Sequence, residues 1–145
     1  MQDEAWGELE PKELAKQILR RYRKIAVVGI SADPLRASNG VSRYMLRNGY
    51  EIVPVNPNLD AFEGIPTYAD LDAVPDDVEV LNIFRRPEFV PELVDAAIRK
   101  GVKAIWMQQG IIHEEAAAKA RAANIAVVMD RCIMQDHLAN RWDAD

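Results

Sequence analysis

The spacing of apolar residues changes repeatedly along this chain. Between Leu14 and Tyr22 apolar residues recur at helical intervals, whereas residues 25–28 form an unbroken apolar run that ends at Gly29. The first pattern predicts an amphipathic helix, and the second predicts a strand buried on both faces. Comparable runs predict further strands, and the full set covers residues 25–28, 51–55, 65–67, 78–84, 102–107 and 125–129.

Helix signals occupy the segments between these runs. Pro11 and Pro87 suit the first turn of a helix, and Ser38 suits a helix N-cap. Gly49 and Gly101 are typical of residues that end a helix. We therefore expect helices that begin near residues 11, 38 and 87, an alanine-rich helix over 114–123 and a short helix over 134–142.

The alternation of buried strands with helices indicates the fold class. Strand–helix–strand units build a parallel sheet with helices on both faces and right-handed crossovers. The sequence predicts one α/β domain over residues 1–145, doubly wound and Rossmann-like, with a mostly parallel sheet of five to six strands. Residues 1–10 are expected to be a loose N-terminal segment. Residues 65–67 are expected as a weak edge strand, because Pro66 cannot donate to a central ladder.

Unusual side chains follow the predicted strands. In an open α/β sheet, ligands bind outside the carboxyl ends of the strands, where the strand order reverses. Hydroxyls, amides and arginines gather after the strands, whereas the opposite loops hold ordinary turn residues such as Gly49, Gly101 and Asn124. The sequence therefore predicts a binding site formed by the loops 29–38, 56–58, 85–87, 108–110 and 130–132.

The loop after the first predicted strand has the features of a phosphate site. Gly29 permits close backbone approach, and Ser31 and Ser38 bring hydroxyls near the start of the next helix. Free N–H groups and the helix dipole favour a phosphate there, and Arg36 can pair with its oxygens. The same residues also suit a simple turn, a helix cap and a solvated arginine, so the loop by itself leaves both interpretations open.

Two common nucleotide-binding motifs are absent from the sequence. The pattern G-x-G-x-x-G needs glycines where Ser31 and Pro34 stand, and G-x-x-x-x-G-K-[ST] does not occur. The second predicted strand leads to Asn56 and Pro57 rather than to the acid that holds a nicotinamide cofactor's ribose. These departures favour a nucleotide other than NAD.

Net charge and cysteine content limit the classes of binding partner and the cellular compartment that we expect. A formal charge of −5 argues against nucleic acid and anionic membranes, which attract clustered cations. The single cysteine, Cys132, allows no internal disulfide and suits a reducing compartment. No secretory signal or membrane-length apolar run is visible, so we expect a cytoplasmic protein. His113, His137 and Cys132 lack metal-ligand spacing, and we expect no metal site.

Several segments within residues 12–138 follow one another in a recognisable order. They are IAVVGIS (25–31), DPLRAS (33–38), VPVNP (53–57), NIFRRPE (82–88), WMQQG (106–110) and DRC (130–132). Together they resemble the small bacterial CoA-binding proteins of Rossmann type, which are similar to the N-terminal nucleotide domain of the succinyl-CoA synthetase α subunit. The synthetase holds its phosphohistidine in a separate domain, and this chain has no segment that could supply one.

The resemblance implies coenzyme A or an acyl-CoA as the ligand. It implies that the loop around Arg36 surrounds the phosphates, that Asn56 and Pro57 lie beside the adenosine, and that residues 84–86 line the remaining groove. Ala37 stands where many relatives are expected to have proline, which loosens the loop slightly. The candidate cofactor-binding residues are Gly29, Ile30, Ser31, Pro34, Arg36, Ser38, Val41, Asn56, Pro57, Phe84, Arg85, Arg86, Gln108 and Gly110.

Candidate catalytic groups are few. His113 suits a helix cap, and Trp106 suits the core. Cys132 and His137, with nearby acids, form the one local group that suggests a nucleophile and a base, but a buried structural cysteine is the simpler interpretation. We therefore expect a protein that binds CoA without its own catalysis. If Cys132 borders the thiol end of the groove, it can form a mixed disulfide with CoA.

Two other classes of function stay open at this stage. One is an enzyme, either an NAD(P)-linked oxidoreductase or a subunit of an acyl-CoA ligase or transferase that works with a partner chain. The other is an interaction module in which the edge residues are purely structural. Similarity of fold does not choose among these classes, because one fold supports many functions.

Overall fold

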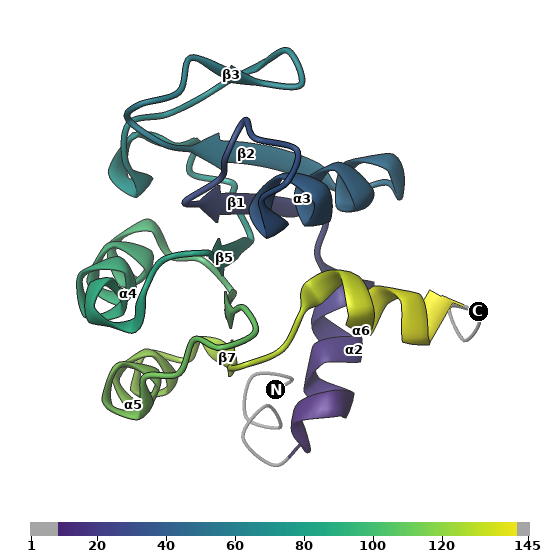
Figure 1. Cartoon of the computed structure of the whole chain (residues 1–145). Helices are drawn as coiled ribbons and strands as arrows, with labels where there is room; N and C mark the ends of the chain where they lie inside the picture. The colour runs from purple at the N-terminus through teal and green to yellow at the C-terminus, as the bar shows by residue number, and fades with distance from the viewer. Residues whose placement is uncertain (1–8, 142–145) are drawn as a thin grey trace.

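The central feature of the computed structural model, which describes residues 9–141, is a parallel sheet with strand order β2-β1-β5-β6-β7 (Figure 1). Each neighbouring pair runs parallel. The prediction of a doubly wound, mostly parallel sheet is thereby confirmed. Most of the predicted loose segment 1–10 lies outside the described residues. The strands are β1 (Lys24–Val28), β2 (Glu51–Val55), β5 (Val80–Ile83), β6 (Ala104–Met107) and β7 (Ala126–Val128).

Helices cover both faces of the sheet (Figure 1). Side chains alternate along a strand, so Ile25 and Val27 of β1 face one way and Ala26 and Val28 the other. The first pair packs in a core with α2, α3 and α6, and the second pair packs in a core with α4 and α5. None of the helices within residues 9–141 is long and apolar enough to cross a membrane. The helices are α2 (Pro11–Arg21), α3 (Ala37–Arg47), α4 (Val90–Lys100), α5 (Glu114–Ala122) and α6 (Ile133–Asn140).

The structure corrects the predicted edge strand at residues 65–67. Ile65–Pro66 forms β4, which pairs antiparallel with β3 (Ala61–Phe62) in a separate two-stranded ribbon. The two residues between these strands, Glu63 and Gly64, both have positive φ, as in tight hairpin turns. This local turn pairs β4 with its sequence neighbour, so it never joins the main sheet.

Helix boundaries differ from the prediction near Pro87 and near the last helix. Pro87 opens a short 3₁₀ turn, η3 (Pro87–Phe89), and α4 itself begins at Val90. The last helix ends at Asn140, and the final residue of its predicted range, Trp142, lies outside the described residues. A second 3₁₀ turn, η2 (Leu71–Ala73), lies in the connection from β4 to β5.

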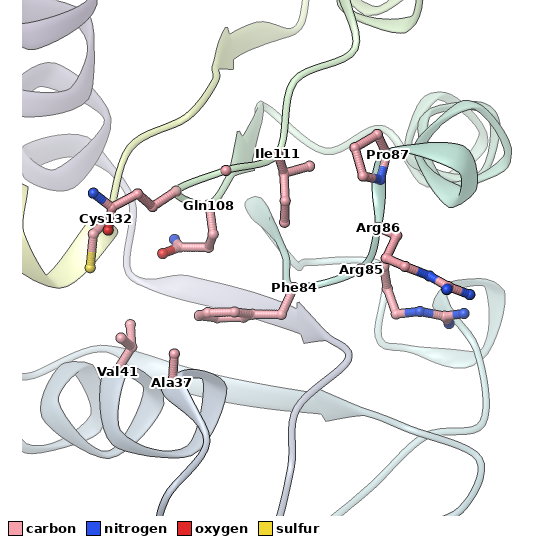
Figure 2. Close-up of a pocket in the computed structure, with 11 residues that line it drawn as sticks. Ala37, Val41, Phe84, Arg85, Arg86, Pro87, Gln108, Ile111 and Cys132 are labelled. Carbon is pink, nitrogen blue, oxygen red and sulfur yellow. The ribbon is translucent and has the colours of Figure 1, made fainter.

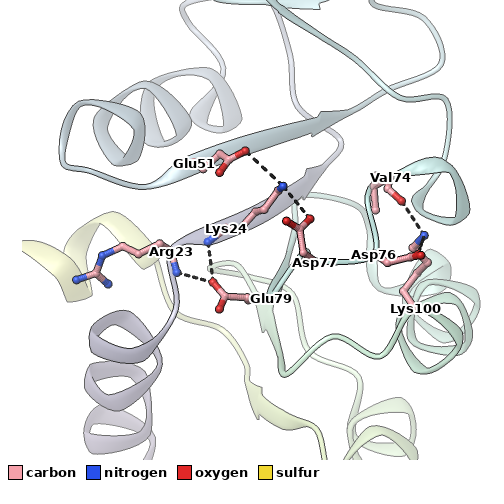
Figure 3. Close-up of polar contacts among 8 residues, drawn as sticks. All are labelled: Arg23, Lys24, Glu51, Val74, Asp76, Asp77, Glu79 and Lys100. Atoms are coloured by element: carbon pink, nitrogen blue, oxygen red, sulfur yellow. Dashed lines mark hydrogen bonds and ion pairs between the residues drawn. The ribbon is translucent and has the colours of Figure 1, made fainter.

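A carboxylate clip holds the start of β1 against β5. Glu79 Oε1 accepts hydrogen bonds from the backbone N–H groups of Arg23 and Lys24, at 2.8 and 3.0 Å (Figure 3). Lys24 Nζ also lies 2.8 Å from Asp77 and 3.5 Å from Glu51. The clip therefore fixes the point at which the chain leaves α2 and enters the sheet.

A close backbone crossing fixes the other end of β1. Gly29 has a φ of +88°, and a Cβ atom there would lie 2.6 Å from the carbonyl oxygen of Phe84. Its N–H also donates to Val55 O at 3.2 Å. The loop after β1 thus passes directly over the end of β5, and only glycine satisfies both the conformation and the space.

We predict that Gly29→Ala lowers the free energy of unfolding by about 2 kcal/mol or more, because the added Cβ meets both an unfavourable φ and the Phe84 carbonyl. Gly49→Ala is the matched control, since Gly49 has a φ of +93° but no atom within 4 Å of an added Cβ. That control is expected to lose only about 1 kcal/mol. Urea unfolding measures both, and equal losses would contradict the crossing's role.

We also predict that Glu79→Ala lowers the free energy of unfolding by about 1–2 kcal/mol, because two backbone donors lose a charged acceptor. Glu79→Gln keeps an acceptor and is expected to lose less. Glu51→Ala removes an exposed ion pair instead, and its loss is expected to stay below about 1 kcal/mol. Thermal and urea unfolding of the three variants test this order, and an equal effect of Glu79→Ala and Glu51→Ala would refute it.

Candidate functional site

The strand order places the crevice of the sheet between β1 and β5. The chain leaves β1 toward β2 on one side and returns to β5 on the other, so the two loops at the carboxyl edge diverge there. These are the β1–α3 loop, residues 29–36, and the β5–η3 loop, residues 84–86. The predicted site residues of both loops therefore belong to one edge of the sheet.

Internal hydrogen bonds hold the β1–α3 loop. The Ser31 hydroxyl accepts from Asp33 N at 3.0 Å, and Asp33 Oδ1 accepts from Leu35 N at 2.9 Å. Asn39 Nδ2 donates to Ser31 O, and Asn56 Nδ2 donates to Ile30 O at 2.8 Å. Asn56 therefore ties the end of β2 to this loop, which gives it a structural role at the edge.

The predicted N-cap role of Ser38 is wrong. Helix α3 begins at Ala37, its N-cap residue is Arg36, and no side chain caps it. Ser38 lies inside the helix and is buried, because its face of α3 turns toward the sheet. The first turn of α3 contains no acidic residue. Its N–H groups and dipole therefore favour an anion at the carboxyl edge.

A cavity of about 480 Å³, here named the Cys132 cavity, opens between α3 and the β6–α5 loop (Figure 2). Figure 2 shows the Phe84 ring beside Val41, with Cys132 at one end and Arg85 and Arg86 at the other. The cavity is therefore mainly apolar around the cysteine and cationic at its far end. Its lining residues are Ala37, Val41, Phe84, Arg85, Arg86, Pro87, Gln108, Gln109, Gly110, Ile111 and Cys132.

A second cavity, of about 430 Å³, lies at the carboxyl ends of β1 and β2 and is here named the Asn56 cavity. Arg85 lines both cavities, so they adjoin at its side chain. The Arg85 guanidinium stacks on Phe89 at 4.0 Å from the ring centroid, which holds it at this junction. The lining residues are Val28, Gly29, Val55, Asn56, Pro57, Asn58, Ala69, Asp70, Leu71, Arg85, Glu92 and Leu93.

A buried amide pair supports the wall of the Cys132 cavity. Gln108 Nε2 donates to Asn82 Oδ1 at 2.7 Å, and both side chains are almost completely buried. Because a buried polar group is costly without a partner, this bond fixes the orientation of Gln108. Asn82 was not among the predicted site residues. Its signal in the sequence is an amide inside the apolar run Val80–Ile83.

The loop that carries Cys132 is tied at three points. Asp130 Oδ1 accepts from Gly110 N at 2.7 Å, and Trp106 Nε1 donates to Arg131 O at 2.8 Å. Arg131 makes a bidentate contact with the buried carboxylate of Asp136, which raises the pKa of the guanidinium. These contacts hold the half-buried Cys132 at the wall of its cavity. Trp106 is fully buried, which confirms its predicted core role.

The structure separates the candidate nucleophile and base. His137 Nδ1 lies 2.7 Å from the Tyr44 hydroxyl and lines a different cavity from Cys132. Asp136 is engaged by Arg131, so it does not orient a histidine. His113 is the N-cap of α5 and accepts from Ala116 N, which confirms its predicted capping role. Around Cys132, the described lining residues offer apolar contact, amides and arginines.

The predicted site residues fall into four groups. Val41, Phe84, Arg86, Gln108 and Gly110 line the Cys132 cavity, Gly29, Asn56 and Pro57 line the Asn56 cavity, and Arg85 lines both. Ile30, Ser31, Pro34, Arg36 and Ser38 line neither cavity. Ile30 is fully buried, whereas Pro34 and Arg36 are exposed in front of α3.

Some lining residues were not predicted. Ile111 follows a predicted loop, and Asp70 and Glu92 come from η2's N-cap and from α4. No local sequence signal marks them, because their place at the edge depends on how the β4–β5 connection and α4 pack on the sheet.

Comparison with known proteins places this chain among relatives of the same size and fold. Residues 23–137 match the model of a CoA binding domain. The uncharacterized protein YneT of Bacillus subtilis is 36% identical over 126 residues, which cover 87% of this chain and 93% of YneT. A hypothetical protein from Pyrococcus horikoshii has a solved structure with a TM-score of 0.85 and 38% identity, covering 90% of this chain and 92% of that one.

A more distant relative is a much longer enzyme. The ADP-forming acetate–CoA ligase II of Archaeoglobus fulgidus is 28% identical over 95 residues, which cover 63% of this chain but only 14% of the ligase. The match to the domain model spans most of the chain, and the similarity to YneT runs over nearly the full length of both proteins. The chain is therefore a member of the CoA-binding domain family.

Proposed function

We propose that this protein binds coenzyme A, or an acyl-CoA, across the two adjoining cavities at the carboxyl edge of the sheet, without catalysis of its own. The observation that carries the proposal is the junction at Arg85, where two cavities of about 480 and 430 Å³ meet beside the start of α3. A long ligand with phosphates at its middle suits two cavities with a cation between them. Membership of the CoA-binding domain family supports this choice of ligand.

The two cavities suit different parts of the ligand. The apolar walls around Val41 and Phe84 suit the pantetheine arm, and Gln108 and Gln109 offer amides to its polar groups. Arg85 and Arg86 suit the phosphates, together with the uncapped N-terminus of α3. Asn56 and Pro57 suit the adenosine. This arrangement directs the thiol toward Cys132.

The proposed absence of catalysis rests on the residues around the thiol end. The described lining residues of the Cys132 cavity include no carboxylate and no imidazole that could act as a general base. A specific observation favours a second function, as a component of an acyl-CoA ligase, because a ligase contains a related segment as 14% of its length. Copurification of this chain with a larger ligase subunit would support that alternative.

We predict that CoA raises the melting temperature of the protein, by mass action on the native state, while NAD and NADP leave it nearly unchanged. Arg85→Ala is expected to weaken CoA binding by roughly tenfold or more, because a charged contact to phosphate is lost. Isothermal titration calorimetry measures the affinities.

Arg47→Ala is the matched control, since Arg47 is an exposed arginine in the last turn of α3 and lines neither cavity. It is expected to bind CoA like the unmodified protein. Equal affinity of the Arg85→Ala variant and the control would remove Arg85 from the site. A shift by NAD as large as that by CoA would overturn the proposed ligand.

We predict that CoA disulfide forms a mixed disulfide with Cys132. The Cys132 thiolate attacks one sulfur of CoA disulfide, the S–S bond breaks, and one CoA leaves as its thiolate. Intact-mass spectrometry is expected to find one CoA adduct that dithiothreitol removes and that Cys132→Ser abolishes. Cys132 is the single cysteine of the chain, so free cysteine disulfide (cystine) serves as the control reagent. If cystine labels Cys132 equally at the same concentration, then binding of CoA in the cavity does not direct its disulfide to Cys132.

A further inference from the structure

The buried amide pair of Asn82 and Gln108 lies on the face of the sheet that carries the Cys132 cavity. Asn82 of β5 stands beside Trp106 of β6 in the strand register. Side chains alternate along a strand, so Gln108, just beyond the end of β6, shares the face of Trp106. That face packs in the core with α3 and α6. The pair therefore lies beneath the wall of the cavity that these helices help to form.

The two amides are hidden from solvent to an unusual degree for polar side chains. Only 1% of Asn82 and 3% of Gln108 is exposed. Gln108 Nε2 donates to Asn82 Oδ1 at 2.7 Å, which satisfies the donor end of one amide and the acceptor end of the other. The carbonyl oxygen of Gln108, Oε1, takes no part in this bond.

The Gln108 carbonyl oxygen reaches the Cys132 cavity. In the part of the chain that the structure describes, no donor bonds to Gln108 Oε1. Over the same residues, Ser42 Oγ is the only fully buried side-chain nitrogen or oxygen without a partner. Gln108 Oε1 is therefore open to a surface, and the surface that Gln108 lines is that of the Cys132 cavity. Figure 2 shows the Gln108 side chain directed into the space between Phe84 and Cys132.

Asn82 determines which end of the Gln108 amide faces a ligand. Asn82 lines neither edge cavity, so it acts on the site through Gln108. Because Asn82 Oδ1 holds the Nε2 end, the amide keeps its donor toward the sheet and its acceptor toward the cavity. An amide that is already held loses less conformational entropy when it binds a ligand than one that is free to turn.

An acceptor at this place complements the other groups of the cavity. Arg85 and Arg86 offer donors only, and the amide of Gln109 belongs to an exposed residue. Around Gln108 the wall is formed by the apolar side chains of Val41 and Phe84. The cavity thus presents one fixed acceptor in an apolar setting. The pantetheine arm of CoA has a matching chemistry, because amide N–H groups interrupt its hydrocarbon between the phosphates and the thiol.

We propose that Gln108 Oε1 accepts a hydrogen bond from an amide N–H of the pantetheine arm, and that Asn82 is a positioning residue that holds Gln108 for this contact. The inference rests on the proposed binding of CoA at the carboxyl edge and names the atom that recognises the arm. The contact favours pantetheine over a plain alkyl chain of equal length, because the alkyl chain leaves a buried acceptor unpaired.

A double-mutant cycle measured by isothermal titration calorimetry tests both parts of the proposal. Gln108→Met keeps the length of the side chain and removes Oε1, and it is expected to weaken CoA binding roughly fivefold. Asn82→Leu removes the acceptor that holds Gln108, and it is expected to weaken CoA binding roughly threefold. The double variant is expected to bind CoA like Gln108→Met alone, because Asn82 acts only through Gln108.

A second ligand separates recognition of the arm from general damage to the fold. The nucleotide portion of CoA without its pantetheine arm is expected to bind all of these variants like the unmodified protein. Thermal unfolding of each variant sets a temperature at which it is folded. Asn82→Ala, which adds no atoms to the core, is the second variant at this position and is expected to behave like Asn82→Leu. Gln135→Met is the matched control, since Gln135 is exposed on α6 and lines neither edge cavity.

Each part of the proposal has a result that overturns it. Equal CoA affinity of the Gln108→Met and Gln135→Met variants would remove the contact with the arm. Additive losses in the double variant would show that Asn82 does not act through Gln108, and equal losses for both ligands would reduce the pair to a structural role. If the unmodified protein does not bind CoA, the proposed function fails as well, whereas CoA binding that Gln108→Met leaves unchanged overturns this inference alone.

Discussion

Burial of the parallel sheet on both faces is the constraint on which the rest of this structure depends. Ile25 and Val27 pack against one helical layer and Ala26 and Val28 against the other, so β1 has no solvent face. A sheet of this kind excludes most polar side chains from its interior, and its polar chemistry collects at the strand ends. The Asn82–Gln108 pair is a polar exception inside the sheet, and it is satisfied by a mutual hydrogen bond.

The two ends of β1 are held by different contacts. At the amino end, Glu79 accepts hydrogen bonds from the backbone N–H groups of Arg23 and Lys24 and so holds the start of β1 next to β5. At the carboxyl end, Gly29, which lines the Asn56 cavity, crosses the carbonyl of Phe84, which lines the Cys132 cavity. The first role of Gly29 is therefore structural, because it allows two backbone segments of the protein to approach closely.

Arg36 and Arg85 have similar places in the sequence but different surroundings in the fold. Arg36 and Arg85 both follow strands and both suit a phosphate, yet Arg36 is exposed in front of α3 and Arg85 stacks on Phe89 between two cavities. The stacked side chain has already lost much of its rotamer freedom, so a contact with a ligand costs it less entropy. For that reason Arg85, rather than Arg36, is the arginine on which the proposed binding test depends.

The sequence by itself determined the α/β class, the parallel sheet, most element positions and the edge at which the polar loops gather, because these follow from local periodicity and turn residues. It also marked Trp106 for the core and His113 for a helix cap. Tertiary structure decided what depends on distant packing. It paired β4 with β3, drew Ser38 into the buried face of α3 and separated His137 from Cys132. It also joined the two edge cavities at Arg85 and packed α2 against α6. Periodicity specifies which face of an element is buried, but the neighbour that covers that face is chosen only when the whole chain packs.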